Sequence, residues 1–353
     1  MRLPKRRPRP RSRLPVPALA AAAQALAQLA PALHELEAQR LGARRGARRA
    51  LGWIAAVCLL FLVAWGGVAV SRGGDDFVGF VGVIAAMMAA LVSAGIWATL
   101  AHPKIADYKA AFKEGVIGRL VADRYPGSRY RHGSGIDIGA FRASGLFRDD
   151  IDRFDSEDLI EGRLGKTSFR ISELHAEYKT QHTDSKGRTT TTWHTIFKGL
   201  YFVGDFHKHF SGVTVVQPEG KLDWRGAIRR RLKRLGHAVE ALEPVRLEDP
   251  DFEAVFAVAG TDQVEARYLL STSLMRRLLD FHQLVGEPVW LSLVGDSMYL
   301  AIASKHDRFE PPSIWPAEAK IDVDDLATYL AEIGLAEDVV EGLALNRRIW
   351  SKR

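Results

Sequence analysis

The sequence predicts an α+β protein: a two-helix transmembrane hairpin followed by a cytosolic mixed α+β domain. Two uninterrupted apolar runs, 50–70 and 77–101, lie in the first third of the 353-residue chain. Helical and alternating hydrophobic patterns share the rest of the chain, 102–353. The one cysteine, Cys58, lies in the first run, so the sequence predicts no disulfide within the chain.

Each apolar run is long enough to cross a bilayer. The runs have 21 and 25 residues without a charge, and at ~1.5 Å per residue they reach ~31 and ~37 Å, against a hydrocarbon core of ~30 Å. Trp53, Trp65 and Trp97 lie near the ends of the runs, where indole rings prefer the membrane interface. We therefore expect transmembrane helices over 50–70 and 77–101.

The charges around the two runs predict their orientation. The connector 71–76 has a net charge of −1. The cations flanking the runs are Arg40, Arg44, Arg45, Arg48 and Arg49 before the first, and Lys104, Lys109 and Lys113 after the second. The positive-inside rule then predicts a bacterial inner-membrane protein with both termini in the cytoplasm.

The net charge of +7 arises before the first run. Residues 1–49 hold 12 Lys or Arg and two acids, a net of +10, whereas the other 304 residues have a net of −3. Residues 1–17 are rich in Arg and Pro, which predicts a disordered basic arm. Such an arm near the cytoplasmic leaflet attracts anionic lipid. Nucleic acid is a less favoured partner because no aromatic residues interleave the arginines.

Residues 18–49 are rich in Ala and Leu and predict an amphipathic helix. Leu26, Leu29, Leu33 and Leu36 form one narrow stripe, and Pro31 is expected to interrupt the pattern. We expect the stripe to pack on the chain's own cytosolic domain; a partner helix is the alternative.

The segment 102–353 mixes both periodicities. Strand patterns cover 130–141, 168–178, 193–206, 212–216, 252–259, 265–270, 289–294 and 298–303. Helical patterns begin at Pro103 and end before Tyr125, and recur over 147–154, 224–235, 271–285 and 322–330. The sequence leaves open a division into two lobes, 102–236 and 245–353.

Asp205, His207 and His209 form the first candidate chemical site. Alternate residues of a strand share a face, and two imidazoles with a carboxylate suit Zn²⁺ or Fe²⁺. Three such residues span roughly 13 Å of strand, however, which is too far for ligands ~2 Å from one metal. We therefore expect a solvent-facing polar edge, with a membrane-tethered metal-dependent hydrolase as the alternative function.

Seven acids crowd residues 149–161. Asp150, Asp152, Asp158 and Glu161 match positions of a calcium loop, but Phe154 and Asp155 stand where a ligand and the turn glycine are needed. A helix with its apolar residues inward and its acids outward is the expected structure.

Residues 224–235 predict a basic amphipathic helix. Its membrane-surface candidates are Trp224, Arg225, Arg229, Arg230, Lys233 and Arg234. A helix with one apolar face and cations elsewhere binds a membrane surface or a partner. The alternative is a surface helix packed on its own domain.

Five short motifs follow one another along the chain: Phe141-x-x-Ser144-Gly145-Leu146-Phe147, Glu157-Asp158-Leu159-Ile160-x-Gly162, Phe197-Lys198-Gly199-Leu200-Tyr201-Phe202, Asp205-Phe206-x-Lys208-x-Phe210 and Glu265-Ala266-Arg267-Tyr268-Leu269-Leu270. Taken in this order, they resemble an uncharacterised bacterial membrane-anchored family, domain-of-unknown-function family three-one-three-seven. The resemblance covers roughly residues 100–310. It implies a membrane address and no established activity, substrate or cofactor.

Common catalytic motifs do not occur in the sequence. It has no Walker-A loop, G-x-S-x-G elbow, H-E-x-x-H helix or paired C-x-x-C. We therefore predict no catalytic residue and no cofactor. The expected function is a non-enzymatic binding or scaffolding module at the membrane surface. Its expected partners are the lipid bilayer, anionic lipid headgroups or another membrane protein.

Overall fold

The computed structural model describes residues 16–72, 76–147, 150–165, 167–183, 187–205, 211–220, 242–304, 307–315 and 321–344. The chain forms two compact units. We call Met1–Val116 with Glu310–Thr328 the helical unit, and Ile117–Phe309 with Tyr329–Arg353 the sheet unit.

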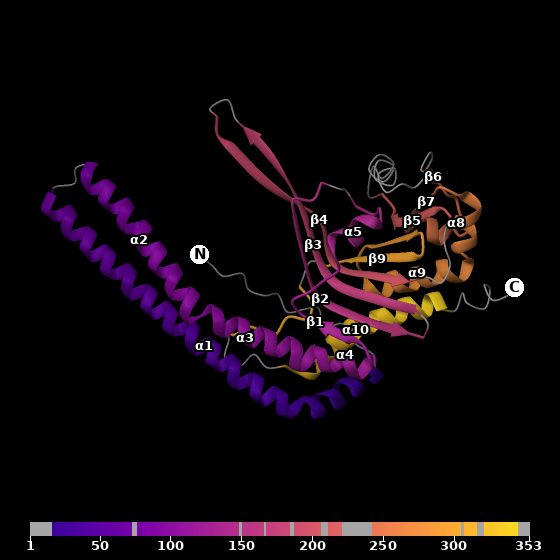
Figure 1. Cartoon of the computed structure of the whole chain (residues 1–353), viewed down its shortest axis with the longest axis horizontal. Coiled ribbons are helices and arrows are strands. Elements are labelled where there is room, and N and C mark those ends of the chain that lie inside the picture. Colours follow the sequence, from indigo (N-terminus) through magenta and orange to yellow (C-terminus); the bar gives the residue numbers. More distant parts are fainter. Residues whose placement is uncertain are drawn as a thin grey trace. The chain divides into compact units, whose positions relative to one another are not determined.

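The helical unit contains α1 (Val16–Arg72), α2 (Asp76–Leu100) and α3 (His102–Phe112), followed by the π-helical turn η1 (Lys113–Ile117). Helices α1 and α2 lie side by side (Figure 1). Small residues line their contact: Ala47, Ala50 and Ala101 are buried together, and a Cβ on Gly46 would lie 2.7 Å from the carbonyl oxygen of Leu100. Small side chains let two helix backbones approach closely, as in transmembrane helix pairs.

At the other end of the pair, Trp65 contacts α2. Its indole N–H donates to the carbonyl oxygen of Val78 at 3.1 Å, and a Cβ on Gly82 would lie 2.6 Å from the same nitrogen. The glycine therefore provides the space that the indole ring occupies.

Helix α1 runs without a break through Pro31, so the expected interruption is wrong. Proline removes one helical hydrogen bond and bends the backbone, but the Ala and Leu around it are strong helix formers. One helix thus contains both the predicted 18–49 helix and the predicted 50–70 span. Helices α1 and α2 each contain a segment long and apolar enough to cross a membrane, with mean hydropathy 2.4 and 2.2.

The sheet unit is built on a nine-stranded sheet in the described residues, in the order β1-β2-β3-β4-β9-β8-β5-β7-β6. Every neighbouring pair is antiparallel. The strands are β1 (Arg129–Arg131), β2 (Arg153–Leu164), β3 (Thr167–Thr183), β4 (Thr189–Asp205), β5 (Val213–Pro218), β6 (Glu243–Pro244), β7 (Phe256–Gly260), β8 (Val289–Val294) and β9 (Ser297–Ala303). Because β4 pairs with β9, the segments 102–236 and 245–353 share one sheet. These findings confirm the predicted α+β class.

Six further helices are described: α4 (Gly118–Arg124), α5 (Ile138–Ala143), α7 (Pro250–Glu253), α8 (Gln263–Leu269), α9 (Thr272–Val285) and α10 (Val323–Ala344). Phe141 of α5 lies at the centre of a buried cluster. Its ring stacks on Phe147 with centroids 5.2 Å apart, and it contacts Phe154 and Tyr201. Aromatic rings bury a large apolar area, so this cluster is a main source of the unit's stability.

The structure confirms two local predictions. Strands β8 and β9 form a hairpin across Gly295, whose φ of 58° suits a tight turn. The helix predicted over 271–285 is α9.

Three local predictions are wrong. Residues 265–270 lie in or next to helix α8 rather than in a strand, because the Asp262 carboxylate accepts the N–H groups of Val264 and Glu265 and caps the helix. Residues 130–141 form the short strand β1 and then α5, which Asp137 caps in the same way. The helix expected over 147–154 does not form, because β2 begins at Arg153 and pairs with β3.

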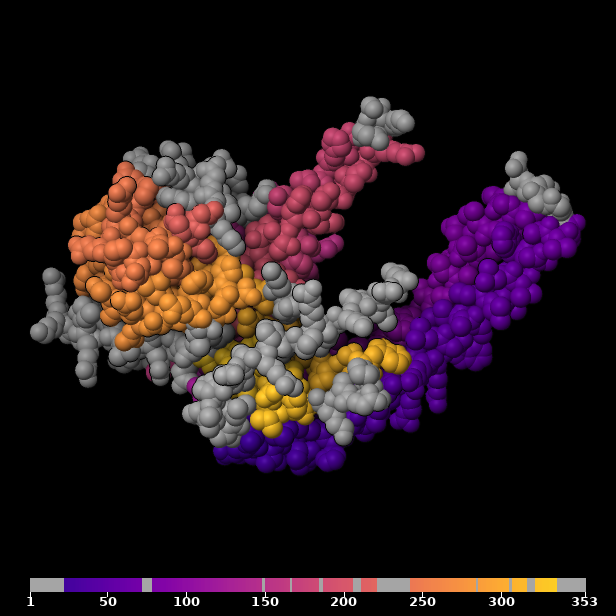
Figure 2. All heavy atoms as spheres, turned by 180° about the vertical axis from the view of Figure 1, so that it is seen from behind, coloured from indigo at the N-terminus to yellow at the C-terminus, as the bar shows by residue number. Residues whose placement is uncertain are grey.

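Strands β3 and β4 extend beyond their neighbours. Pairing with β2 reaches only Glu177, and pairing with β9 begins only at Gly199. Residues 178–183 and 189–194 therefore pair with each other as a two-stranded ribbon, which we call the arm. The arm projects from the sheet in both views of the molecule (Figures 1 and 2).

Candidate functional site: a charged cavity on the sheet

A cavity of about 500 Å³ lies on the sheet unit where β2, β3 and β4 run side by side. Its lining is mostly charged, and comprises Asp155, Ser156, Glu157, Glu173, Leu174, His175, Lys198 and Asp307. Most of these residues come from the three strands, and Asp307 comes from the segment after β9. This cavity is the candidate functional site.

The strand register places the charged side chains in two rows. Asp155 of β2 lies opposite His175 of β3, which lies opposite Lys198 of β4. Glu157 of β2 lies opposite Glu173 of β3. Because residues two apart on a strand share a face, both rows point to the same side of the sheet.

Glu173 is the most buried acid of the cavity, at 5% exposure. Its two carboxylate oxygens accept the backbone N–H of Arg308 at 2.9 and 3.2 Å. Burial, which disfavours the charged form, raises the pKa of Glu173 to about 8; Asp307, Asp158 and Glu157 raise it further, while the Arg308 N–H opposes them. The carboxyl group therefore keeps its proton near neutral pH.

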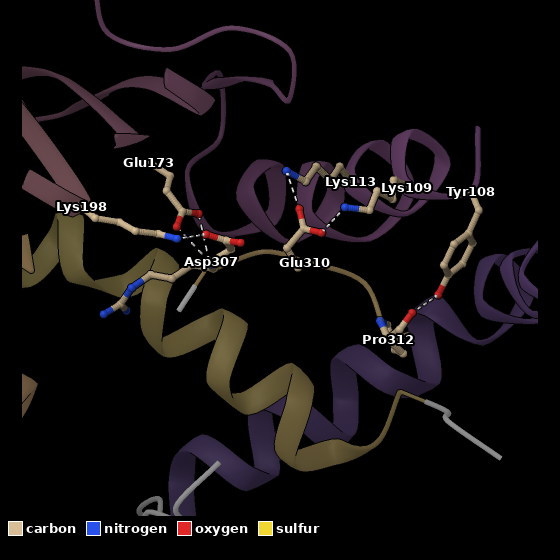
Figure 3. A network of polar contacts seen from close by, with 9 residues as sticks. Tyr108, Lys109, Lys113, Glu173, Lys198, Asp307, Glu310 and Pro312 are labelled. Atoms are coloured by element: carbon tan, nitrogen blue, oxygen red, sulfur yellow. Dashed lines mark hydrogen bonds and ion pairs between the residues drawn. The ribbon is translucent and has the colours of Figure 1, made fainter. Parts of the chain in front are cut away.

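Lys198 holds the same segment from the neighbouring strand. Its ammonium lies 2.7 Å from the carboxylate of Asp307 (Figure 3), and its carbonyl oxygen accepts the N–H of Ser304. The segment after β9 is thus attached to β3 through Glu173 and to β4 through Lys198.

A bulge in β2 shapes the acidic side of the cavity. The register with β3 shifts between Glu157 and Ile160, and Asp158 within the bulge has a φ of 59°. Asp158 is fully buried, and its carboxylate accepts the hydroxyl of Tyr130. Left-handed backbone in a non-glycine residue is uncommon and occurs where surrounding structure enforces it.

Acids of 149–161 are held by separate partners rather than directed at one calcium ion. Asp152 accepts the backbone N–H of Lys179, Asp158 is bound by Tyr130, and Glu161 pairs with Arg131. Over the described ranges, no group of three or more His, Cys, Asp or Glu side chains is placed to hold a metal ion.

The cavity can bind a polar ligand through several kinds of group. It offers carboxylates on β2, the ring nitrogens of His175, and a Glu173 carboxyl that can donate as well as accept a hydrogen bond. Asp307 compensates the charge of Lys198. Carboxyl groups outnumber cations in the lining, which favours cationic or hydroxyl-bearing ligands.

The residues that the sequence singled out lie elsewhere. Asp205 is exposed at the end of β4, opposite Ser297, and His207 and His209 lie outside the described residues. The membrane-surface candidates Trp224, Arg225, Arg229, Arg230, Lys233 and Arg234 lie outside them too, as do Phe206, Lys208 and Phe210 of the family motif.

Sequence reasoning missed Glu173, although its neighbours carried a signal. Phe169 and Ile171 of β3 are buried, and Glu173 continues their alternation on the same face of the strand. A charged residue at the next position of an apolar face predicts a buried carboxyl group.

The helical unit has a smaller cavity, of about 230 Å³. Leu26, Leu33 and Leu36 of the predicted stripe line it together with Tyr108 and Pro312. The stripe therefore faces later segments of the same chain.

Polar contacts hold that later segment to α3 and η1. The Tyr108 hydroxyl donates to the carbonyl oxygen of Pro312 at 3.1 Å. The Glu310 carboxylate lies 2.6 Å from the Lys109 ammonium and 3.2 Å from that of Lys113 (Figure 3).

Comparison with known proteins gives one family and one structure. No curated relative matches the sequence. The crystal structure of the mycobacterial trehalose monomycolate transport factor A, TtfA, is similar to 62% of this chain and 94% of that chain, at 8% identity and a TM-score of 0.32. Residues 195–345 match the family described as "Protein of unknown function (DUF3137)", so the match begins and ends later than the predicted 100–310. The matched stretch begins within β4 and extends through α10, so over this part the chain is similar to the DUF3137 family.

Proposed function

We propose that the chain is a two-pass inner-membrane protein whose cytosolic α+β domain is a non-enzymatic binding module at the membrane surface. The observation that carries this proposal is the large apolar surface of α1 and α2. Leu60 and Val63 of α1 and Leu91 of α2 are each about two-thirds exposed. Soluble proteins rarely expose contiguous apolar surface on this scale, whereas a lipid environment favours it.

The charge distribution supports an orientation with both termini inside. The arginines Arg44, Arg45, Arg48 and Arg49 precede the first span directly, and Lys104 follows the second. Two of the arginines also contact a segment that follows the sheet. The Arg44 and Arg48 guanidinium groups lie over the Trp315 ring, at 5.5 and 5.8 Å from its centroid. Trp315 would then share the cytoplasmic side with the arginines.

Cysteine labelling tests the orientation. In a Cys58→Ala background, Ser71→Cys reports the connector and Thr189→Cys reports the arm. We expect a membrane-impermeant maleimide to label Ser71→Cys in intact spheroplasts and Thr189→Cys only after permeabilisation. Labelling of Thr189→Cys in intact spheroplasts would overturn the proposed topology.

The charged cavity and the basic segment 224–235 support binding as the role of the domain. The cavity presents hydrogen-bonding groups of several types within one recess, which is the usual basis of specific recognition. The six cations of 224–235 would attract anionic headgroups once the chain is anchored beside them.

Hydrogen exchange of the full chain in nanodiscs tests the lipid contact. We expect residues 224–235 to exchange more slowly in discs with anionic lipid than in neutral discs. The variant Arg229→Glu, Arg230→Glu, Lys233→Glu should remove that difference. A matched control, Arg246→Glu, Arg267→Glu, Arg276→Glu, makes the same change of charge at arginines outside 224–235. In this control, the difference in exchange between anionic and neutral discs should remain. Equal exchange of the wild-type chain in both discs would contradict the lipid-binding role.

A further inference from the structure

One edge of the arm lacks the charged and proline residues that usually protect an exposed strand. Residues Thr189–Thr195 of β4 read TTTTWHT and contain no Lys, Arg, Asp, Glu, Pro or Gly. Natural sheets blunt their free edges with charges, prolines, bulges or short strands, because an unpaired edge is a template for another strand. We call Thr189–Thr195 the threonine edge.

The threonine edge pairs on one side only in the described part of the chain. It pairs with β3, from Thr183↔Thr189 to Glu177↔Thr195. On its other side, β9 begins to pair with β4 only at Gly199. The side chains of Thr189–Trp193 and of Thr195 are exposed, so a further strand has access to this side.

The two edges of the arm differ in charge. On β3, Lys179 carries a charge and is bound by Asp152 through its backbone N–H and its ammonium. The matching stretch of β4 has no acid or base apart from the His194 imidazole. A charge therefore protects the β3 edge of the arm, whereas the β4 edge has no such charge.

The occupant that fits an uncharged edge is an identical edge. Two copies related by a two-fold axis present the same strand to each other in antiparallel register, and no like charges meet across the pair. Seven residues is an ordinary strand length, and opposed threonines add cross-strand hydrogen bonds. The edge residues themselves offer a partner no acid or base apart from the His194 imidazole, although the Arg153 guanidinium of β2 lies 4.3 Å from the centroid of the Trp193 ring.

The register of such a pair follows from the ends of the edge. At its far end, Ile196 has no partner in β3, because Thr195 pairs with Glu177 and Phe197 with Ala176. This bulge limits the regular edge to Thr189–Thr195, whose midpoint is Thr192. We propose that the threonine edge pairs antiparallel with that of a second copy of this chain. The two arms then form a four-stranded ribbon with Thr192 opposite Thr192 of the other copy.

Cysteine crosslinking of the full chain in detergent tests the register. Opposed residues in an antiparallel pair have Cα atoms about 4.5–5.5 Å apart, within the range of a disulfide. In a Cys58→Ala background, Thr192→Cys should form a disulfide-linked dimer on mild oxidation. Thr180→Cys is the matched control, because Thr180 is exposed and pairs with Thr192 inside the same arm. We expect at least tenfold more crosslinked dimer with Thr192→Cys; equal yields or no dimer would overturn the proposal.

A charge placed on the edge gives a second test. The mass of the full chain in detergent, measured by light scattering, should correspond to a dimer. Thr192→Lys should raise the dissociation constant at least tenfold, because two lysines then face each other, whereas Thr180→Lys should change it less than twofold. A monomeric wild-type chain, or a dimer that Thr192→Lys leaves intact, would overturn the proposal. Circular dichroism of both lysine variants checks that the fold is kept.

Discussion

The helical unit and the sheet unit place the same kinds of side chain in opposite positions. In α1 and α2, leucines such as Leu60 and Leu91 face outward, 69% and 66% exposed. In β8 and β9, Leu291 and Leu300 face inward, each 2% exposed. The interiors differ as well, since Ala47, Ala50 and Ala101 are buried together where α1 meets the end of α2, while aromatic rings fill the core of the sheet unit.

This reversal shows what holds each unit together. The sheet unit has the arrangement of a protein in water, where burying apolar area is the main driving force. Between helices in lipid that force is absent, and close backbone packing of small residues replaces it. One chain would thus be stabilised by different interactions in its two units. Four substitutions can measure these interactions one at a time.

Phe141→Ala should give the largest effect. Removing a fully buried ring from the aromatic cluster should lower the free energy of unfolding of the sheet unit by about 3–5 kcal/mol. Thermal unfolding of the full chain in detergent, followed by circular dichroism at strand wavelengths, measures it. Leu60→Ala removes an exposed side chain of α1 and should leave the same transition unchanged. A comparable loss in both variants would contradict the distinction between the units.

Glu173→Gln should give the next effect, and only at high pH. The pKa of Glu173 is about 8 in the folded chain against 4.5 for the free group. Its contribution to stability is therefore fully present below pH 4.5 and is lost as the pH rises through 8. Glutamine keeps the shape and carries no charge.

We therefore expect Glu173→Gln to be more stable than wild type by no more than about 5 kcal/mol at pH 9, since each unit between the pKa values of about 8 and 4.5 corresponds to about 1.4 kcal/mol. The two proteins should be alike at pH 4. Thermal unfolding across this pH range measures the difference. A Glu173→Gln profile parallel to wild type would show that Glu173 is charged at neutral pH.

Gly46→Val tests the packing of the helices. The added Cβ would lie 2.7 Å from the Leu100 carbonyl oxygen, so the helices must separate, at a cost of about 1–2 kcal/mol. Amide hydrogen exchange near Leu100 should speed up about tenfold. Gly52→Val makes the same change in α1 at a site where a Cβ meets nothing within 4 Å. If amide hydrogen exchange near Leu100 were accelerated equally in Gly46→Val and Gly52→Val, the cause would be the changed helix propensity of α1 rather than its packing on α2.

Lys198→Met should give the smallest effect. The Lys198–Asp307 pair is partly exposed, with side chains 29% and 58% accessible, so losing it should cost less than about 1 kcal/mol. The melting temperature of the variant should be only a few degrees below that of wild type. This difference between the two proteins should be smaller at high salt than at low salt. A larger loss would show that the segment after β9 depends on this pair more than on the Glu173 contact.

The sequence predicted those parts of the fold that local patterns determine. The charge-free runs predicted the helices of the hairpin, and the turn at Gly295 predicted the pairing of β8 with β9. The errors arose where a capping residue or a distant strand decided the structure. Asp262 makes a helix of a stretch with strand-like residues, and β2 forms because β3 lies beside it.

The candidate site could be predicted less well for the same reason. Glu173 carried a local signal, as a charge on an apolar strand face. Its partners Asp307 and Arg308 come more than 130 residues later, and nothing near them in the sequence indicates that they meet β3. The rows of charge across β2, β3 and β4 exist only once the register is known.

The return of Glu310–Thr328 to the helical unit has a consequence for how the chain is made. Lys109 leaves the ribosome 201 residues before the Glu310 that binds it. At about 5–20 residues per second, roughly 10–40 s of synthesis separate the two. The hairpin α1–α2 can form early, because its contacts are local. The helical unit is complete only after the whole nine-stranded sheet has been translated, so the first part of the protein to be synthesised is among the last to be finished.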